Sequence, residues 1–137
     1  MISREFEARL KRTMGQDVDL PVQIELNWDP EIDPLAVQAI IQVEDEEDVV
    51  WHFARDLLVQ GCSTLFPCGG GDVKFRYQYN QGVILMCLRN LTGHADLALP
   101  AGEVMAFVKE TLAIQKLGEE VVDTLLDEAI EEMLGGS

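Results

Sequence analysis

The chain has 137 residues, of which 47% are hydrophobic, so it is long and apolar enough for one folded domain over residues 1–137. Its 25 acidic and 10 basic residues give a net charge of -15. Because so negative a surface repels phosphate backbones and anionic lipids, we expect neither nucleic-acid binding nor direct membrane insertion.

The first half of the chain alternates apolar and polar residues, as strands of a half-buried sheet do. The alternation is clearest from Val22 to Trp28. Further strands are predicted at Phe6–Leu10, Leu35–Val43 and Val49–His52, with turns at Met14–Asp17, Asp29–Pro34 and Glu44–Asp48.

The second half adds a short helix, three strands and then helices. The helix is predicted over Phe53–Gly61, where a glycine closes it. The predicted strands are Val73–Tyr79, Val83–Leu88, which we expect to be buried on both faces, and Ala95–Leu99. A loop from Cys62 to Gly71 and a turn at Asn80–Gly82 separate these elements.

Two helices are predicted in the C-terminal part, at about 101–134. Val104, Phe107, Val108 and Leu112 fall on one face of the first helix. The second combines an apolar stripe with seven acids, Glu119, Glu120, Asp123, Asp127, Glu128, Glu131 and Glu132. Strands and a short helix up to about residue 99, followed by helices, predict a mostly antiparallel α+β fold.

The residues that usually perform catalysis form no recognisable motif. None of the three serines lies in a Gly-x-Ser-x-Gly sequence, and His52 and His94 are far apart. A Cys–His pair formed in the fold stays open as an alternative. We therefore predict a non-enzymatic protein and nominate no catalytic, cofactor-binding or metal-binding residue.

Three possible ligand sites have simpler interpretations. Cys62 and Cys68 would be an unusual zinc pair, and Cys87 lies in an apolar run that predicts core packing. Gly69–Gly71 leads into a strand and not into the helix that a phosphate loop needs. The acidic run Glu44–Asp48 lacks the order of a calcium loop, so a solvated hairpin tip is favoured.

Cysteine usage and the N-terminus favour a cytoplasmic protein. Three cysteines without a Cys-x-x-Cys spacing are typical of reduced thiols. The first residues carry charges where a signal peptide needs an apolar stretch, and the longest apolar run is too short to cross a bilayer.

Aromatic side chains are concentrated on one predicted strand. Phe75, Tyr77 and Tyr79 share a face, beside Lys74 and Arg76. Such a strand could stack the bases of single-stranded nucleic acid. In so acidic a chain, a core stripe or an oligomer contact is favoured, and a single-stranded nucleic-acid-binding module remains the alternative function.

Several segments contain motifs of a known family. Asp33–Val37 has the order Asp-Pro-x-Ala-Val, and Trp51–Leu58, followed by Gly61, has the order Trp-x-Phe-Ala-Arg-Asp-Leu-Leu. These segments resemble a strand opening and the signature of the SsgA-like sporulation and cell-division family of actinomycetes. Gly71–Val73 and Gly82–Val83 match later strand entries. Leu97–Pro100 and Ala106–Thr111 resemble the last strand and the helix after it.

The resemblance implies a non-catalytic regulator of sporulation-specific septation that brings the division protein FtsZ to septum sites. It implies related SsgA-like proteins as partners and recruitment from the cytoplasm to the division septum. It also implies a fold like the whirly single-strand binders, with two crossed antiparallel sheets, and a homo-oligomer, with a trimer suspected. The partner-binding residues are unknown at this stage.

Two sets of charged residues leave alternatives open. FtsZ is acidic as a family, so contact with it should use an apolar patch or local bases such as Arg9, Lys11 and Arg12. Arg55 and Asp56 could face a partner. We favour a structural role, in which Asp56 interacts with the helix dipole and Arg55 ties a neighbouring strand or loop.

Overall fold

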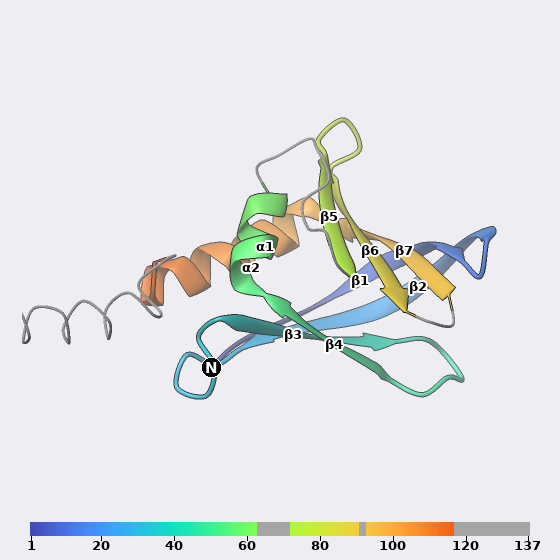
Figure 1. The fold of residues 1–137 in the computed structure, drawn as a ribbon. Coiled ribbons are helices and arrows are strands. Elements are labelled where there is room, and N and C mark those ends of the chain that lie inside the picture. Colours follow the sequence, from blue (N-terminus) through green and yellow to red (C-terminus); the bar gives the residue numbers. More distant parts are fainter. Residues whose placement is uncertain (63–71, 91–92, 117–137) are drawn as a thin grey trace, which may run out of the picture.

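The computed structural model describes residues 1–62, 72–90 and 93–116. In this part of the chain, seven antiparallel strands form one sheet in the order β4-β3-β2-β1-β7-β6-β5 (Figure 1). The strands are β1 (Ile2–Thr13), β2 (Gln16–Trp28), β3 (Ala36–Gln42), β4 (Val49–Ala54), β5 (Val73–Gln78), β6 (Val83–Asn90) and β7 (Gly93–Pro100). The helices are α1 (Arg55–Gly61) and α2 (Ala101–Ile114).

The sheet curls because its central strand has different partners along its length. β1 pairs with β2 from Ile2 to Thr13, whereas its pairing with β7 covers only Arg9 to Thr13. Between Leu10 and Arg12 the register shifts against both neighbours, which marks a bulge. The two arms of the sheet, β2-β3-β4 and β7-β6-β5, therefore diverge and enclose a half-barrel (Figure 1).

This topology confirms the predicted α+β class and corrects its arrangement. The described strands form one continuous, strongly curved sheet and not two crossed sheets. The reason is the length of β1 and β2, 12 and 13 residues, which lets one hairpin belong to both arms. The likeness to whirly proteins stays a prediction.

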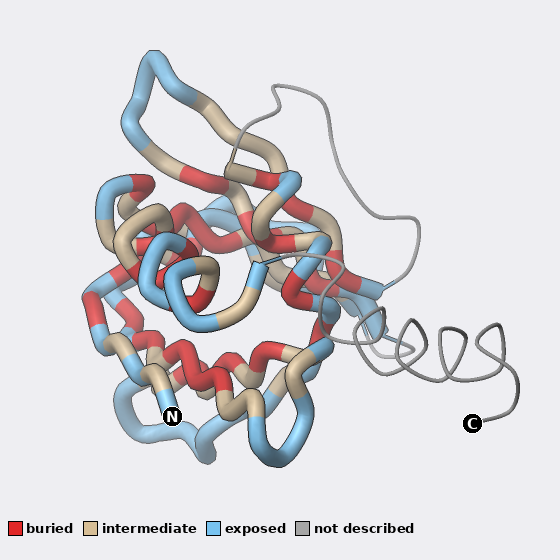
Figure 2. Tube along the Cα trace, turned by 90° about the vertical axis from the view of Figure 1, so that its left-hand side faces the viewer, coloured by how far each residue is buried: buried red, intermediate tan, exposed pale blue. Residues whose placement is uncertain are grey.

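The core lies on the concave side of the sheet, where alternate residues are buried along much of β1, β2, β3, β5 and β6. On β2 these residues include Val22, Ile24, Leu26 and Trp28, as their spacing predicts. Figure 2 shows buried segments of both arms facing the helices between them. Burial of this apolar surface is the main stabilising term of the fold.

Helix α2 fills one end of the half-barrel with the predicted stripe. Val104, Phe107 and Val108 are buried, and Leu112 is half-buried. The helix follows β7 directly, and the amide of Ala101 donates a hydrogen bond to the Gly82 carbonyl in the β5–β6 turn. That bond satisfies one of the free amides at the start of the helix.

Four details differ from the sequence-based prediction or fall outside the described residues. Phe53 and Ala54 end β4, so α1 begins at Arg55. β6 is buried on one face only, because its residues Val83, Leu85 and Cys87 point outward and are half-buried. Most of the predicted loop after Cys62 and the predicted last helix lie outside the described residues.

Candidate functional site

The end of the half-barrel away from α2 opens into an apolar pocket of about 320 Å³. The described ends of three hairpins frame it, those of β1 and β2, of β3 and β4, and of β6 and β7 (Figure 1). Its lining residues are mostly apolar: Leu10, Thr13, Met14, Val22, Ile41, Val43, Val49, Trp51, Leu88, Asn90, Gly93, His94, Ala95 and Leu97.

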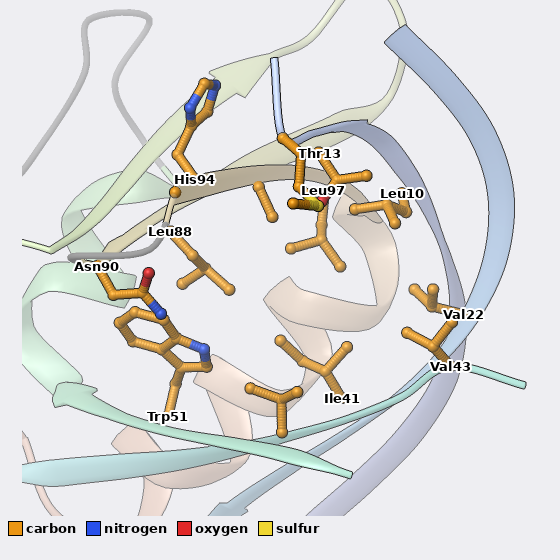
Figure 3. Close-up of a pocket in the computed structure, with 14 residues that line it drawn as sticks. Leu10, Thr13, Val22, Ile41, Val43, Trp51, Leu88, Asn90, His94 and Leu97 are labelled. Atoms are coloured by element: carbon orange, nitrogen blue, oxygen red, sulfur yellow. The ribbon is translucent and has the colours of Figure 1, made fainter. Parts of the chain in front are cut away.

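Both arms of the sheet contribute to the pocket wall. Figure 3 shows Trp51 of β4 beside Asn90 of β6 on one side, and Val22 of β2 with Val43, which follows β3, on the other. Trp51 is half-buried, although it belongs to the same inner row of β4 as the buried Phe53. A backbone hydrogen bond from the Met14 amide to the His94 carbonyl, 3.4 Å long, ties two of the tips together.

The chemistry of the pocket suits binding better than catalysis. Among the described residues that line it, His94 is the one titratable group, and the walls consist mainly of Leu, Ile, Val, Ala and Trp side chains. A cavity of this kind accepts an apolar group, and a few polar groups at its edge fix the orientation of the ligand. Sequence reasoning missed this pocket, because its walls come from hairpin ends that are remote in sequence. The apolar residues at the strand ends, such as Val43 and Val49, were its only signal.

The acidic run forms a solvated hairpin tip, as predicted. Glu44–Asp48 joins β3 to β4, and all five side chains are exposed. Asp45 has a positive φ of 64°, as residues in tight turns can have. In the ranges 1–62, 72–90 and 93–116, no three His, Cys, Asp or Glu side chains group as a metal site would require.

Local acids compensate the basic residues that were candidates for binding FtsZ. Arg9 and Lys11 both lie against Asp19, at 2.9 and 3.1 Å, and Arg12 lies 3.7 Å from Asp17. Hydrogen bonds from Arg9 and then Lys11 lower the pKa of Asp19, and the Asp19 hydrogen bond raises that of Arg9. Of the two alternatives for partner contact, this arrangement favours the apolar patch.

Arg55 and Asp56 have structural partners. Arg55 is 1% exposed, and its Nη1 donates hydrogen bonds to the carbonyls of Thr111, at 3.2 Å, and Gln115, at 2.6 Å. Its guanidinium also packs on the ring of Trp28 in β2, which is the predicted contact with a strand. The two hydrogen bonds show that Arg55 in addition holds the end of α2. Asp56 lies in the first turn of α1 and accepts a hydrogen bond from Gln60.

Among the described residues, neither cysteine forms a reactive pair with a histidine. Cys87 and His94 line one small polar cavity, but burial and then the neighbouring Asp96 raise the pKa of Cys87 to about 11. A thiol of that pKa is a poor nucleophile at neutral pH. Cys62 follows α1 and is half-buried, whereas His52 is exposed on β4, and burial raises the pKa of Cys62 to about 11 as well. Cys68 and Gly69–Gly71 lie outside the described residues.

The aromatic stripe is mainly part of the core. Phe75 is 1% exposed and packs edge-on against Phe53, with ring centres 5.1 Å apart. Tyr77 is half-buried and contacts Tyr79, which is 60% exposed in the following turn. A base-stacking platform needs several exposed rings in a row, whereas of these three rings only that of Tyr79 is exposed, and it lies in the turn after the strand.

Comparison with known proteins identifies the family. The model of the family described as "Streptomyces sporulation and cell division protein, SsgA" matches residues 22–120. The chain belongs to this SsgA family. The role of the chain therefore lies in sporulation and cell division, as the residues quoted for the resemblance predict.

Relatives and solved structures agree with this membership. Over 133 residues, 96% of this chain and 95% of the relative, the chain is 35% identical to sporulation-specific cell division protein SsgB of Streptomyces coelicolor. It is 31% identical to SsgB of Salinispora tropica over 96% and 93% of the two chains.

Two solved structures of SsgA-like proteins share the fold. The SsgA-like protein of Thermobifida fusca matches with a TM-score of 0.76 and 25% identity, over 96% of this chain and 94% of that one. A second structure comes from work on SsgB mutations that correlate to longitudinal cell division during sporulation of Streptomyces coelicolor. It matches with a TM-score of 0.71 and 35% identity, over 87% of this chain and 91% of that one.

None of the described helices is both long and apolar enough to cross a membrane.

Proposed function

We propose that this SsgA-family protein acts in sporulation septation without catalysis, by recruiting or positioning FtsZ at septum sites through direct protein contacts. In this proposal it moves from the cytoplasm to the septum, works as a homo-oligomer, with a trimer suspected, and has related SsgA-like proteins as further partners. The observation that supports contact with a protein is the apolar pocket framed by three hairpin tips.

The charge distribution supports an apolar contact. FtsZ is acidic as a family, and this chain carries a net charge of -15, so overall charge steering would oppose the encounter. Arg9, Lys11 and Arg12 have acidic neighbours of their own. Burial of apolar surface is the remaining source of affinity that this part of the molecule offers.

Imaging of sporulating hyphae tests the proposal. The gene is deleted in its own host, and FtsZ carries a fluorescent label. We expect FtsZ rings at regular septum sites to be lost after deletion and restored by the wild-type gene. A fluorescent fusion of the chain should appear at these sites before the septa close.

Two results would contradict the proposal. The first is a regular ladder of FtsZ rings in the deletion strain. The second is tight binding of the purified chain to single-stranded oligonucleotides near physiological ionic strength, measured by gel shift, because an acidic adaptor should leave the oligonucleotide unshifted.

A further inference from the structure

The sheet of the half-barrel ends at β4 with an open edge. In the described part of the chain, β4 pairs with β3 on one side and with no strand on the other. An open edge offers backbone amides and carbonyls to an incoming strand. Val49 and Val50 stand at this edge and are 45% and 48% exposed.

The inner face of this edge strand leads into the apolar pocket. Val49 and Trp51 both line the pocket, and they pair in register with Ile41 and Ala39, which are buried. A strand laid beside β4 would continue the curved sheet. Because side chains alternate along a strand, every second side chain of that segment would point into the pocket.

A run of uncompensated negative charge lies at one end of the same edge. Glu44–Asp48 immediately precedes β4, and its five exposed carboxylates form no ion pair within the described residues. These charges favour a ligand with Lys or Arg beside its apolar residues. They disfavour a fatty acid, whose carboxylate would be repelled, and a second copy of this chain, which carries the same run.

We propose that the β4 edge and the adjoining pocket bind an extended segment of a partner protein by strand addition. The segment places alternate apolar side chains in the pocket and at least one Lys or Arg beside Glu44–Asp48. Main-chain hydrogen bonds to β4 supply affinity, while the pocket and the acidic tip supply selectivity. The inference deepens the proposed function, on which it rests, because it states which kind of segment in the partner is recognised.

Selection from a display library of random short peptides on the full chain tests this site. We expect enriched peptides to alternate apolar residues and to contain Lys or Arg next to them. An enriched peptide is then synthesised and titrated against the chain. The amide signals of Val49–Phe53, observed by NMR, should shift on binding and become protected from hydrogen exchange.

Two variants, each with a matched control, separate the pocket from the charged tip. Val49→Lys places a charge at the pocket entrance and should weaken peptide binding about tenfold or more, which corresponds to about 1.4 kcal/mol. Its matched control is Ile32→Lys, which changes an 83% exposed residue in the β2–β3 turn and should leave binding unchanged. Glu46→Gln with Glu47→Gln should weaken binding about two- to tenfold, and Glu5→Gln with Glu31→Gln should not.

Several outcomes would overturn the inference. The first is the absence of enriched peptides, and the second is equal peptide binding by Val49→Lys and the wild type. The third is a smaller oligomer for Val49→Lys in sedimentation, which would mean that a second copy of the chain covers the β4 edge. Oleate that binds the wild type but not Val49→Lys, while no peptide does, would assign the pocket to a lipid. If FtsZ rings depend on the gene but no peptide binds, this inference fails and the proposed function stands.

Discussion

The guanidinium carbon of Arg55 lies 4.7 Å from the centre of the Trp28 ring, so the first residue of α1 packs on the last residue of β2. The same guanidinium donates to two carbonyls at the end of α2. One buried side chain therefore joins the helix after β4, the central hairpin and the last described helix. A cation in this position also interacts favourably with the negative end of the α2 dipole.

Replacing Arg55 with alanine should destabilise the fold strongly. Hydrogen bonds to a charged group contribute about 1.5–3 kcal/mol each, so the loss of two should cost about 3 kcal/mol or more. Urea denaturation of Arg55→Ala and the wild type measures this difference. Partner binding, measured where both proteins are folded, should be equal. Lost binding with unchanged stability would instead place Arg55 in a partner interface.

Gly61 is required by its contact with β5. A Cβ atom at Gly61 would lie 2.5 Å from the Cβ of Phe75, a backbone-anchored atom that cannot move away alone. Gly61→Ala should therefore destabilise the chain by about 1–3 kcal/mol through overpacking. Thermal unfolding followed by circular dichroism gives the change, and an unaltered melting temperature would refute the close packing of α1 on β5.

Gly102 provides the matched control for that substitution. It lies in the first turn of α2, and a Cβ atom there would meet nothing within 4 Å. Because alanine favours the helix and restricts the unfolded chain, Gly102→Ala should stabilise by about 0.4–1 kcal/mol. Opposite signs for the two glycine substitutions, in the same unfolding assay, are the expected result.

The two described thiols should react slowly at neutral pH. Burial raises the pKa of Cys62 and of Cys87 from 9.0 to about 11, so few thiolates are present near pH 7. In a Cys68→Ser background, alkylation by iodoacetamide should accelerate about tenfold per pH unit until about pH 11. A rate that levels off near pH 9 would contradict the burial of both groups.

The same shifts make stability depend on pH in the alkaline range. The folded chain keeps thiol protons that the unfolded chain releases above pH 9.0, so the stabilising contribution is complete below that pH and is lost as the pH rises toward about 11. The free energy of unfolding of a variant with both Cys62→Ala and Cys87→Ala should therefore fall less between pH 9.0 and about 11 than that of the wild type. If the free energies of unfolding of the two proteins fell in parallel with pH, the raised pKa values of the thiols would be contradicted.

Asp19 should contribute to stability in the acid range. Its pKa is lowered by hydrogen bonds from Arg9 and Lys11, so its contribution is present above the ordinary value of 3.8 and is lost as the pH falls through the lowered value. Because these groups are exposed, Asp19→Asn should change the melting temperature little at neutral pH. Below pH 3.8 the wild type should lose more stability than the variant, and a larger loss in the variant would be the contrary result.

The strands of this protein could be predicted because their burial follows a local pattern. Val22, Ile24, Leu26 and Trp28 alternate with polar residues, and they are buried as the alternation indicates. The stripe of Val104, Phe107 and Val108 on α2 was predictable for the same reason. Burial in a half-covered sheet depends on side-chain period, which is a property of neighbouring residues.

Other features could not be derived from local patterns, because they depend on which strands pair. Local alternation does not tell that one long hairpin joins both arms of the sheet. The family resemblance implied two crossed sheets, whereas the described strands form one curved sheet. Arg55 was recognised as structural, but its contact with Gln115 joins residues that are 60 positions apart.

The strand and helix pattern, the acidic character and the SsgA-family motif around Trp51–Leu58 can all be recognised in the amino-acid sequence. The tertiary structure alone decided that the ends of three hairpins meet around Trp51 to form an apolar pocket beside an open strand edge. The physical reason is that composition and periodicity are set by residues close in the chain. A binding cavity is instead set by the curvature of the sheet, which brings distant residues together.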